Sequence, residues 1–258
     1  MSPTSTDEER LQQWDVLRLR ANNQGPLTMS GTNSWVVGRG PAWVVDPGPA
    51  LAEHQEALAT ELVQRGGLGG IALTHDHIDH SESAEALRER FSAPLAAGRA
   101  SADVELSDGG RFGPFEVLYT PGHAPDHFAL TLDGVCFTGD AVLGEGSVFI
   151  ARGPGALTGY LDALARLRER ELDVLCPGHG PPIWNARERL SEYIEHRLDR
   201  ERQLLAAIAE GRRTTEELLD GAWSDVPEQL RPLAAVTLGA HLDKLAEEGR
   251  LPLPFAAL

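Results

Sequence analysis

The chain has 258 residues, of which 41% are hydrophobic and 24% charged, and 39 Asp and Glu against 23 Lys and Arg give a formal net charge of −16. This composition is that of a globular protein, and the acidic excess disfavours a protein whose main work is binding phosphate backbones. The absence of an apolar run of about 18 residues and of a signal-peptide pattern, with only two cysteines, leads us to expect a cytoplasmic protein with no membrane span and no disulfide framework.

The first part of the chain predicts short strands separated by Gly and Pro turns. Strands are expected at residues 35–37, 43–45, 71–73, 115–119, 128–132, 135–137 and 174–176. Helical periodicity lies between some of them, at 50–65 and 157–170. Several strands, such as 43–45, are apolar throughout, which indicates burial on both faces. We therefore expect two packed sheets with helices outside.

The pattern changes after Trp184. A long amphipathic helix is expected over 185–210. A capping-box pattern then opens a short helix at 216–219. A last helix is expected over 227–248, followed at 250–255 by a short extended hairpin or wing. These features predict two domains, 1–184 and a small helical domain at 185–258.

Histidine and aspartate side chains gather after the ends of the predicted strands. They are His75, His77, Asp79, His80, His123, Asp140 and His179. Imidazole nitrogen and carboxylate oxygen are ligands that zinc prefers. Residues 75 and 77 point the same way in an extended backbone, whereas 79 and 80 follow as the loop turns and can face a second ion. The other histidines on predicted helices, His54, His196 and His241, are interpreted as structural.

Four segments resemble, in order, the metal motifs of the metallo-β-lactamase superfamily: HDHIDH at 75–80, TPGH at 120–123, TGD at 138–140 and PGHG at 177–180. The resemblance implies an αββα sandwich of the α/β (α+β) class with the site at one edge. It also implies that His75, His77 and His123 bind a first metal. The second metal would be bound by Asp79, His80 and His179, and Asp140 would bridge the two.

Two further residues have weaker signals. Asp46 matches the superfamily's early aspartate, which supports the ligand loop. A turn-forming role in its Asp-Pro-Gly sequence explains it equally well. His127 falls where relatives often place another polar residue near the site, and we favour a supporting role over a surface one. Asp76 occupies a variable position and is given no role.

Single positions disfavour several branches. His77 stands where flavodiiron-type members have Glu, and Asp140 stands where one class of β-lactamases has Cys, so antibiotic hydrolysis is disfavoured. Segments at 139–147, 177–183, 193–197 and 242–250 resemble the β-lactamase-like protein 2 group. That resemblance implies a winged-helix-like C-terminal domain. Animal members of the group are associated with single-stranded RNA cleavage, and related fungal members are thioesterases.

The leading hypothesis is a hydrolase with two zinc ions, iron or manganese being alternatives, that acts on an ester, thioester or lactone of a small substrate. A metal-bridged hydroxide would attack, and Asp79 and Asp140 would be the catalytic carboxylates, one of them able to shuttle a proton. The acidic balance favours a small acyl substrate over a polyanion.

Two other functions remain open. One is a metal-dependent endoribonuclease of single-stranded RNA, with Arg187, Arg189, Arg197, Arg200 and Arg202 lining a path. Interleaved carboxylates instead favour a paired, solvated surface. The other is a DNA-binding regulator, which the acidic last helix disfavours, so we expect no duplex DNA partner. That helix is expected to pack on the metal domain or to form a homodimer contact.

Overall fold

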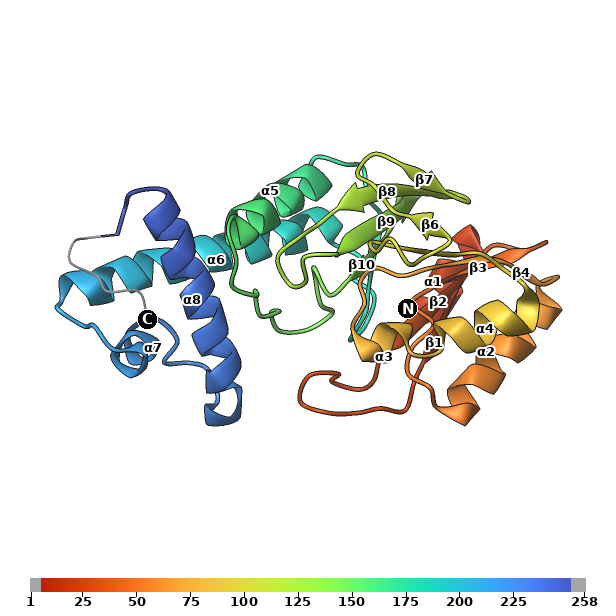
Figure 1. Cartoon of the computed structure of the whole chain (residues 1–258), viewed down its shortest axis with the longest axis horizontal. Helices are drawn as coiled ribbons and strands as arrows, with labels where there is room; N and C mark the ends of the chain where they lie inside the picture. Colours follow the sequence, from red (N-terminus) through yellow and green to blue (C-terminus); the bar gives the residue numbers. More distant parts are fainter. Residues whose placement is uncertain (1–5, 252–258) are drawn as a thin grey trace, which may run out of the picture. The chain divides into compact units, whose positions relative to one another are not determined.

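The computed structural model describes residues 6–251, which contain two β-sheets (Figure 1). The six-stranded sheet has, in spatial order, β1 (Val16–Arg20), β2 (Asn33–Val37), β3 (Ala42–Val45), β4 (Leu68–Ala72), β5 (Leu95–Ala97) and β6 (Val104–Glu105). The five-stranded sheet has β11 (Val174–Pro177), β10 (Val135–Gly139), β9 (Phe128–Leu132), β8 (Phe115–Tyr119) and β7 (Arg111–Phe112). All the predicted strands are confirmed.

Parallel pairing places the carboxyl ends of neighbouring strands at the same edge of a sheet. In the six-stranded sheet β3 and β4 are parallel neighbours, and in the five-stranded sheet β10 and β11 are. The remaining pairs of the five-stranded sheet are antiparallel. Because parallel neighbours reach the same edge with their carboxyl ends, the loops that follow them lie together. These loops begin at residues 46, 73, 140 and 178.

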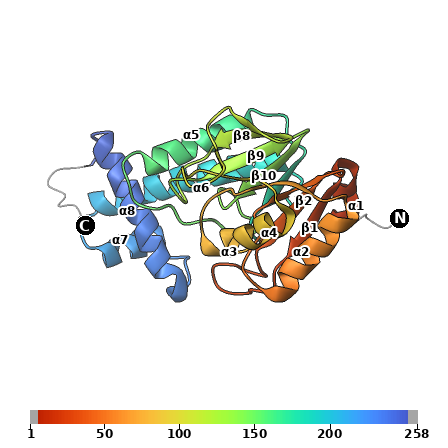
Figure 2. The same ribbon diagram turned by 45° about the vertical axis from the view of Figure 1, so that its right-hand side comes forward.

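One hydrophobic core lies between the two sheets, and a second lies between the six-stranded sheet and the helices that cover it. Trp35 of β2 and Phe137 of β10 meet in the first core, with ring centroids 6.0 Å apart. In the second core Leu58 of α2 (Ala52–Gln64) and Leu87 of α4 (Ala84–Phe91) pack against β3 and β4. Figures 1 and 2 show α2 and α4 along the same face of this sheet. Burial on both faces explains strands that are apolar throughout.

Contacts divide the described residues into two compact units. The sheet unit comprises 6–120, 126–146 and 171–186, and the helical unit comprises 121–125, 147–170 and 187–251. The segment 121–125 and helix α5 (Ala156–Arg168) therefore group with the C-terminal helices. The domain boundary near residue 185 remains a prediction, because this division follows contacts and not the linear order of the chain.

The remaining helical elements are α1 (Asp7–Leu11), η1 (Gln12–Trp14), α3 (Ile78–Ser81), α6 (Ala186–Ala209), α7 (Thr215–Ala222), η2 (Glu228–Leu230) and α8 (Arg231–Glu247). The predicted capping box at α7 is confirmed, since Glu217 N–H donates to Thr214 Oγ1 and the Glu217 carboxylate accepts from Thr214 N–H. The last helix is shorter than predicted, because a 3₁₀ turn occupies 228–230. Most of the predicted wing lies outside the described residues.

Helices α6, α7 and α8 share an apolar core. Its members include Leu204, Ile208, Leu218, Trp223, Leu238 and Leu245. No helix of the part of the chain that the structure describes is long and apolar enough to cross a bilayer.

Buried His241 is expected to make the helical unit less stable in acid. Within the described residues neither of its ring nitrogens has a hydrogen-bond partner. Burial, reinforced by the charges of Arg197 and Lys244, lowers the pKa of His241 to about 3. The unfolded chain binds a proton below pH ~6.5 while the folded chain does not. We therefore expect the free energy of unfolding to fall by roughly 1 kcal/mol per pH unit from pH ~6.5 toward 4.

Urea unfolding at pH 7 and pH 5 tests this expectation, with His241→Met as a variant of similar volume that cannot titrate. The variant should lose less stability between the two pH values than the wild type does. Equal losses of stability in both proteins would show that His241 is not the source of the acid sensitivity.

Candidate metal centre

The ligand loop, residues 73–77, connects β4 to the short helix α3. His75 is buried three residues after the end of β4, and exposed His77 directly precedes the first residue of α3. Nε2 of His75 lies 3.0 Å from Nδ1 of His77. Asp79 and His80 lie within α3 itself. The expectation that residues 75 and 77 face one ion and residues 79 and 80 a second one stays a prediction, since the His75 and His80 rings also lie close together, with centroids 4.3 Å apart.

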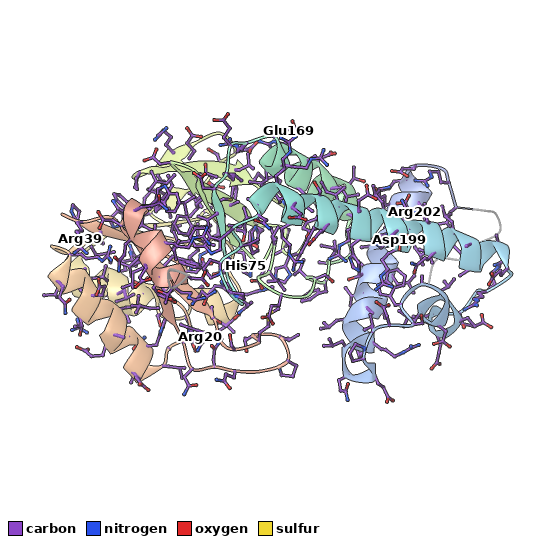
Figure 3. The ribbon with its side chains drawn as sticks, turned by 180° about the vertical axis from the view of Figure 1, so that it is seen from behind. Arg20, Arg39, His75, Glu169, Asp199 and Arg202 are labelled. Carbon is purple, nitrogen blue, oxygen red and sulfur yellow. The ribbon has the colours of Figure 1, made fainter. Side chains whose placement is uncertain are left out.

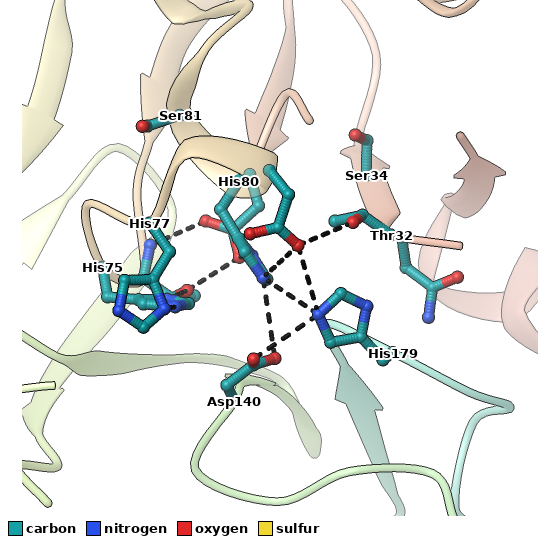
Figure 4. A network of polar contacts seen from close by, with 12 residues as sticks. Thr32, Ser34, His75, His77, His80, Ser81, Asp140 and His179 are labelled. Atoms are coloured by element: carbon teal, nitrogen blue, oxygen red, sulfur yellow. Dashed lines mark hydrogen bonds and ion pairs between the residues drawn. The ribbon is translucent and has the colours of Figure 1, made fainter. Parts of the chain in front are cut away.

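A second group of side chains converges from three elements of the sheet unit (Figure 4). The Nε2 atoms of His80 and His179 lie 3.3 Å apart. Asp79 Oδ2 is 3.5 Å from the first of these atoms and 3.3 Å from the second. The Asp140 carboxylate faces the same two atoms at 3.6 and 3.4 Å. One imidazole pair and two carboxylates thus share a single small volume.

The backbone beside this group admits only glycine. Gly178 lies between β11 and His179, and a Cβ there would be 2.5 Å from both Asp140 Oδ1 and His80 Cε1. Its N–H donates to the carbonyl of Gly139, which joins the two parallel strand ends. The close approach of the strand ends is what brings Asp140 and His179 to His80.

This donor set fits a divalent cation. His80 Nδ1 lies 2.9 Å from Asp46 Oδ2, which fixes the N–H at Nδ1 and turns the Nε2 lone pair toward His179 and the carboxylates. Imidazole nitrogens and carboxylate oxygens facing one another repel unless positive charge lies between them. Geometric grouping gives His75, His80 and Asp140 as one potential ligand set and Asp79, His80 and His179 as another.

The electrostatics of the protein groups favour positive charge here. Burial alone would lower the pKa of His179, but hydrogen bonds to Asp140 and Asp79 raise it to about 10. Burial would raise the pKa of Asp79, yet the His179 hydrogen bond and the charge of His80 lower it to about 2. The pKa of His80 rises as well, because Asp140 and Asp46 outweigh its burial. A cation ligated here would benefit from the same carboxylates.

Asp46 supports the ligand loop from the end of β3. Its carboxylate accepts hydrogen bonds from Thr74 N–H and Thr74 Oγ1–H, each at 2.7 Å, and from His80 Nδ1. Its backbone is left-handed with φ of 51°, which Asp tolerates. One side chain therefore fixes both the strand end and the orientation of His80.

His127 supports Asp140. It is fully buried, and its Nε2 accepts the Asp140 N–H at 3.1 Å. Nδ1 must then carry the proton and donate to Thr120 Oγ1 at 2.7 Å. The imidazole thus holds the backbone that carries the Asp140 carboxylate.

His123 is buried within the helical unit. Its Nδ1 lies 3.4 Å from the carbonyl oxygen of Phe149, and the two rings are 4.8 Å apart. This contact makes Nε2 the nitrogen that would bind a metal. Asp76, which was given no role, pairs at the surface with Arg99 at 2.5 Å. His54, interpreted as structural, contacts Ser34 Oγ at 2.9 Å.

Two polar residues of the centre were missed in the sequence. Thr32 is buried, its Oγ1–H donates to Asp79 Oδ2 at 2.9 Å, and its backbone bridges to His179. Asn33 donates through Nδ2 to the carbonyls of Pro177 and Gly180, which fixes the His179 loop. The available signal was a Thr-Asn-Ser run opening an otherwise apolar strand, since buried polar groups require partners.

Thr32→Val is expected to weaken metal binding at Asp79 by ~10-fold or more, the usual cost of losing a partner behind a ligand. Valine keeps the shape but removes the hydroxyl that orients Oδ2. Zinc retained against a graded competing chelator measures the effect. Thr32→Ser keeps the hydroxyl and should stay near wild type, whereas equal loss in both variants would point to packing instead.

Packed sheets with histidines and aspartates gathered past their strand ends define a metal-dependent hydrolase. Residues 27–104 and 98–179 match the metallo-beta-lactamase superfamily, and residues 214–251 match the beta-lactamase associated winged helix domain. The chain therefore belongs to the metallo-beta-lactamase superfamily. The predicted sandwich fold and winged-helix-like C-terminal region are confirmed.

Relatives extend over most of the chain. It is 30% identical to the beta-lactamase-like protein 2 homolog of Caenorhabditis elegans, over 93% of this chain and 86% of the relative. It is also 30% identical to an atrochrysone carboxyl ACP thioesterase of Aspergillus chevalieri, over 83% of this chain and 75% of that relative. A solved metallo-beta-lactamase family protein of Thermus thermophilus is similar with a TM-score of 0.69 and 26% identity, over 91% of this chain and 94% of that one.

Proposed function

We propose that this hydrolase cleaves the thioester or ester bond of a small acyl substrate and holds two zinc ions. The observation that carries the proposal is the convergence of the His80 and His179 Nε2 atoms with the Asp79 and Asp140 carboxylates within 3.3–3.6 Å. His75, His77 and His123 would bind the first ion, and Asp79, His80 and His179 the second, with Asp140 between them. Iron or manganese would suit the same ligands less well than zinc.

Two bound zinc ions would supply a water activated near neutral pH and would polarise the scissile carbonyl. The other residues of the site would orient the ligands and transfer protons. Asp46 keeps His80 in the tautomer that leaves Nε2 available, and His127 fixes Asp140. A carboxylate oxygen of Asp79 or Asp140 that is not engaged in ligation could accept the proton of the attacking water and pass it to the leaving group.

The acyl substrate class rests on two observations. A relative that is 30% identical is named a carboxyl ACP thioesterase, and the net charge of −16 disfavours a polyanionic substrate. Two of the arginines on which the RNA alternative depends are paired with carboxylates. Arg200 pairs with Asp225 at 2.7 Å, and Arg202 lies beside Asp199 on α6 at 3.2 Å (Figure 3).

A hydrolysis panel with zinc-loaded full-length protein tests the proposal. It would contain an acyl-CoA, an acyl carrier protein thioester, a simple ester, a lactone, a β-lactam and single-stranded RNA. We expect acyl hydrolysis that EDTA abolishes and zinc restores, with two zinc ions per chain by elemental analysis. His77→Ala should lower the rate by at least ~100-fold. Metal-dependent RNA cleavage with inert acyl substrates would overturn the substrate class, and one metal or fewer per chain would overturn the dinuclear site.

A further inference from the structure

Within the helical unit, the loop of residues 147–155 is bound along helix α8. Ile150 N–H donates to Thr237 Oγ1 at 3.1 Å, in a buried position. The Arg152 guanidinium makes two hydrogen bonds to the Asp243 carboxylate, at 3.1 and 2.7 Å. Gly155 N–H donates to Glu247 at 3.0 Å. These attachments follow α8 from its first half to its last residue.

Gly239 makes this attachment sterically possible. A Cβ at residue 239 would lie 2.5 Å from Cδ and 2.9 Å from Nε of Arg152. The Arg152 side chain therefore crosses α8 where the helix has no side chain of its own. Glycine in a helix interior costs about 1 kcal/mol relative to alanine, so helix stability does not account for this residue.

The same loop holds the segment that carries His123. Ala151 N–H donates to the carbonyl of Gly122 at 3.0 Å, and the Phe149 carbonyl contacts Nδ1 of His123. Residues 149 and 151 thus bind the His123 segment, while residue 150 between them binds α8. Successive residues of one short loop therefore contact both the His123 segment and α8.

We infer that helix α8 of the C-terminal winged-helix region positions His123, with the 147–155 loop as the connecting part. The inference rests on the proposed function in one respect, because His123 is a metal ligand only within that proposal. It gives the C-terminal region a part in the hydrolase: Thr237 and Gly239 are positioning residues that act on His123 through Ile150 and Arg152.

Two substitutions on α8 break the attachment in different ways. Gly239→Ala adds the Cβ that displaces Arg152, yet it should stabilise the helix itself. Thr237→Val removes the acceptor of the Ile150 N–H with little change in shape, and Thr237→Ser restores a hydroxyl. Gly153→Ala is the matched control, because a Cβ there meets no atom within 4 Å.

Hydrogen exchange of the Ala151 amide in the full-length protein is the first measurement. We expect at least ~10-fold faster exchange in Gly239→Ala and Thr237→Val, with Thr237→Ser and Gly153→Ala near wild type. Unchanged exchange in both α8 variants would overturn the inference, whatever the metal content of the protein.

Zinc titration against a competing chelator is the second measurement. One of two zinc ions should bind ~10-fold more weakly in Gly239→Ala and Thr237→Val. If the wild type binds two ions and both variants retain them with wild-type affinity, α8 does not position His123 for ligation. If the wild type itself binds fewer than two ions, the proposed function fails, and the exchange measurement still decides whether α8 holds the loop.

Discussion

Replacing Asp140 by alanine is expected to lower kcat/KM of the zinc-loaded protein by ~10³-fold or more. The Asp140 carboxylate faces Nε2 of both His80 and His179, so its loss removes the group best placed to lie between two cations. Metal ions contribute several kcal/mol of transition-state stabilisation, and each 1.36 kcal/mol is a factor of ten in rate. Zinc per chain should fall below two. Steady-state kinetics on the best acyl substrate and elemental analysis measure the two effects.

The matched control for this variant is Asp76→Ala. Asp76 belongs to the same cluster of acidic and histidine residues in the sequence, but it pairs with Arg99 at the surface. Its replacement should change kcat/KM by less than about threefold, because exposed ion pairs contribute little. An Asp140→Ala protein that keeps two zinc ions and activity within tenfold of wild type would contradict the bridging role.

The candidate ligand motifs could be located in the sequence because each of them lies at or shortly after the end of a strand. Parallel pairing brings the carboxyl ends of β10 and β11 to one edge of the five-stranded sheet, as it does those of β3 and β4 in the six-stranded sheet. The supporting residues were harder to find. Thr32 and Asp79 are 47 positions apart, and Asn33 lies 144 positions from Pro177. Such pairs depend on how the two sheets pack, which spacing in the sequence does not reveal.

The missed strands have a similar explanation. β1 alternates Leu and Arg and is only partly buried, so it lacks the continuous apolar pattern used to find the others. β5 is three residues long and β6 and β7 are two, too short for any periodicity to be visible. The arginines of α6 are a case in which the sequence pattern predicted exposure that the structure does not show. Their interleaving with carboxylates predicted a solvated face, but Arg197 and Arg200 are buried.

Asp46→Asn separates the two roles considered for Asp46. Asparagine tolerates the left-handed backbone and forms the same kind of turn, so a purely turn-forming residue would survive the change. The carboxylate, however, accepts from Thr74 N–H, Thr74 Oγ1–H and His80 Nδ1 at once. An amide nitrogen must face one of these groups. If it faces His80, it donates to Nδ1 and moves the ring proton to Nε2, the atom proposed to bind metal.

If the amide nitrogen instead faces Thr74, a buried N–H loses its acceptor, which costs about 1–3 kcal/mol. Either orientation is harmful, so we expect ~10- to 100-fold weaker zinc binding and lower stability to urea. Asp15→Asn is the control, because Asp15 also has a left-handed backbone, with φ of 54°, but pairs with Arg39 at the surface. Wild-type zinc affinity in Asp46→Asn would leave the turn as the sufficient explanation. Loss confined to Asp46→Asn would establish that its charge, acting through His80, organises the second metal site.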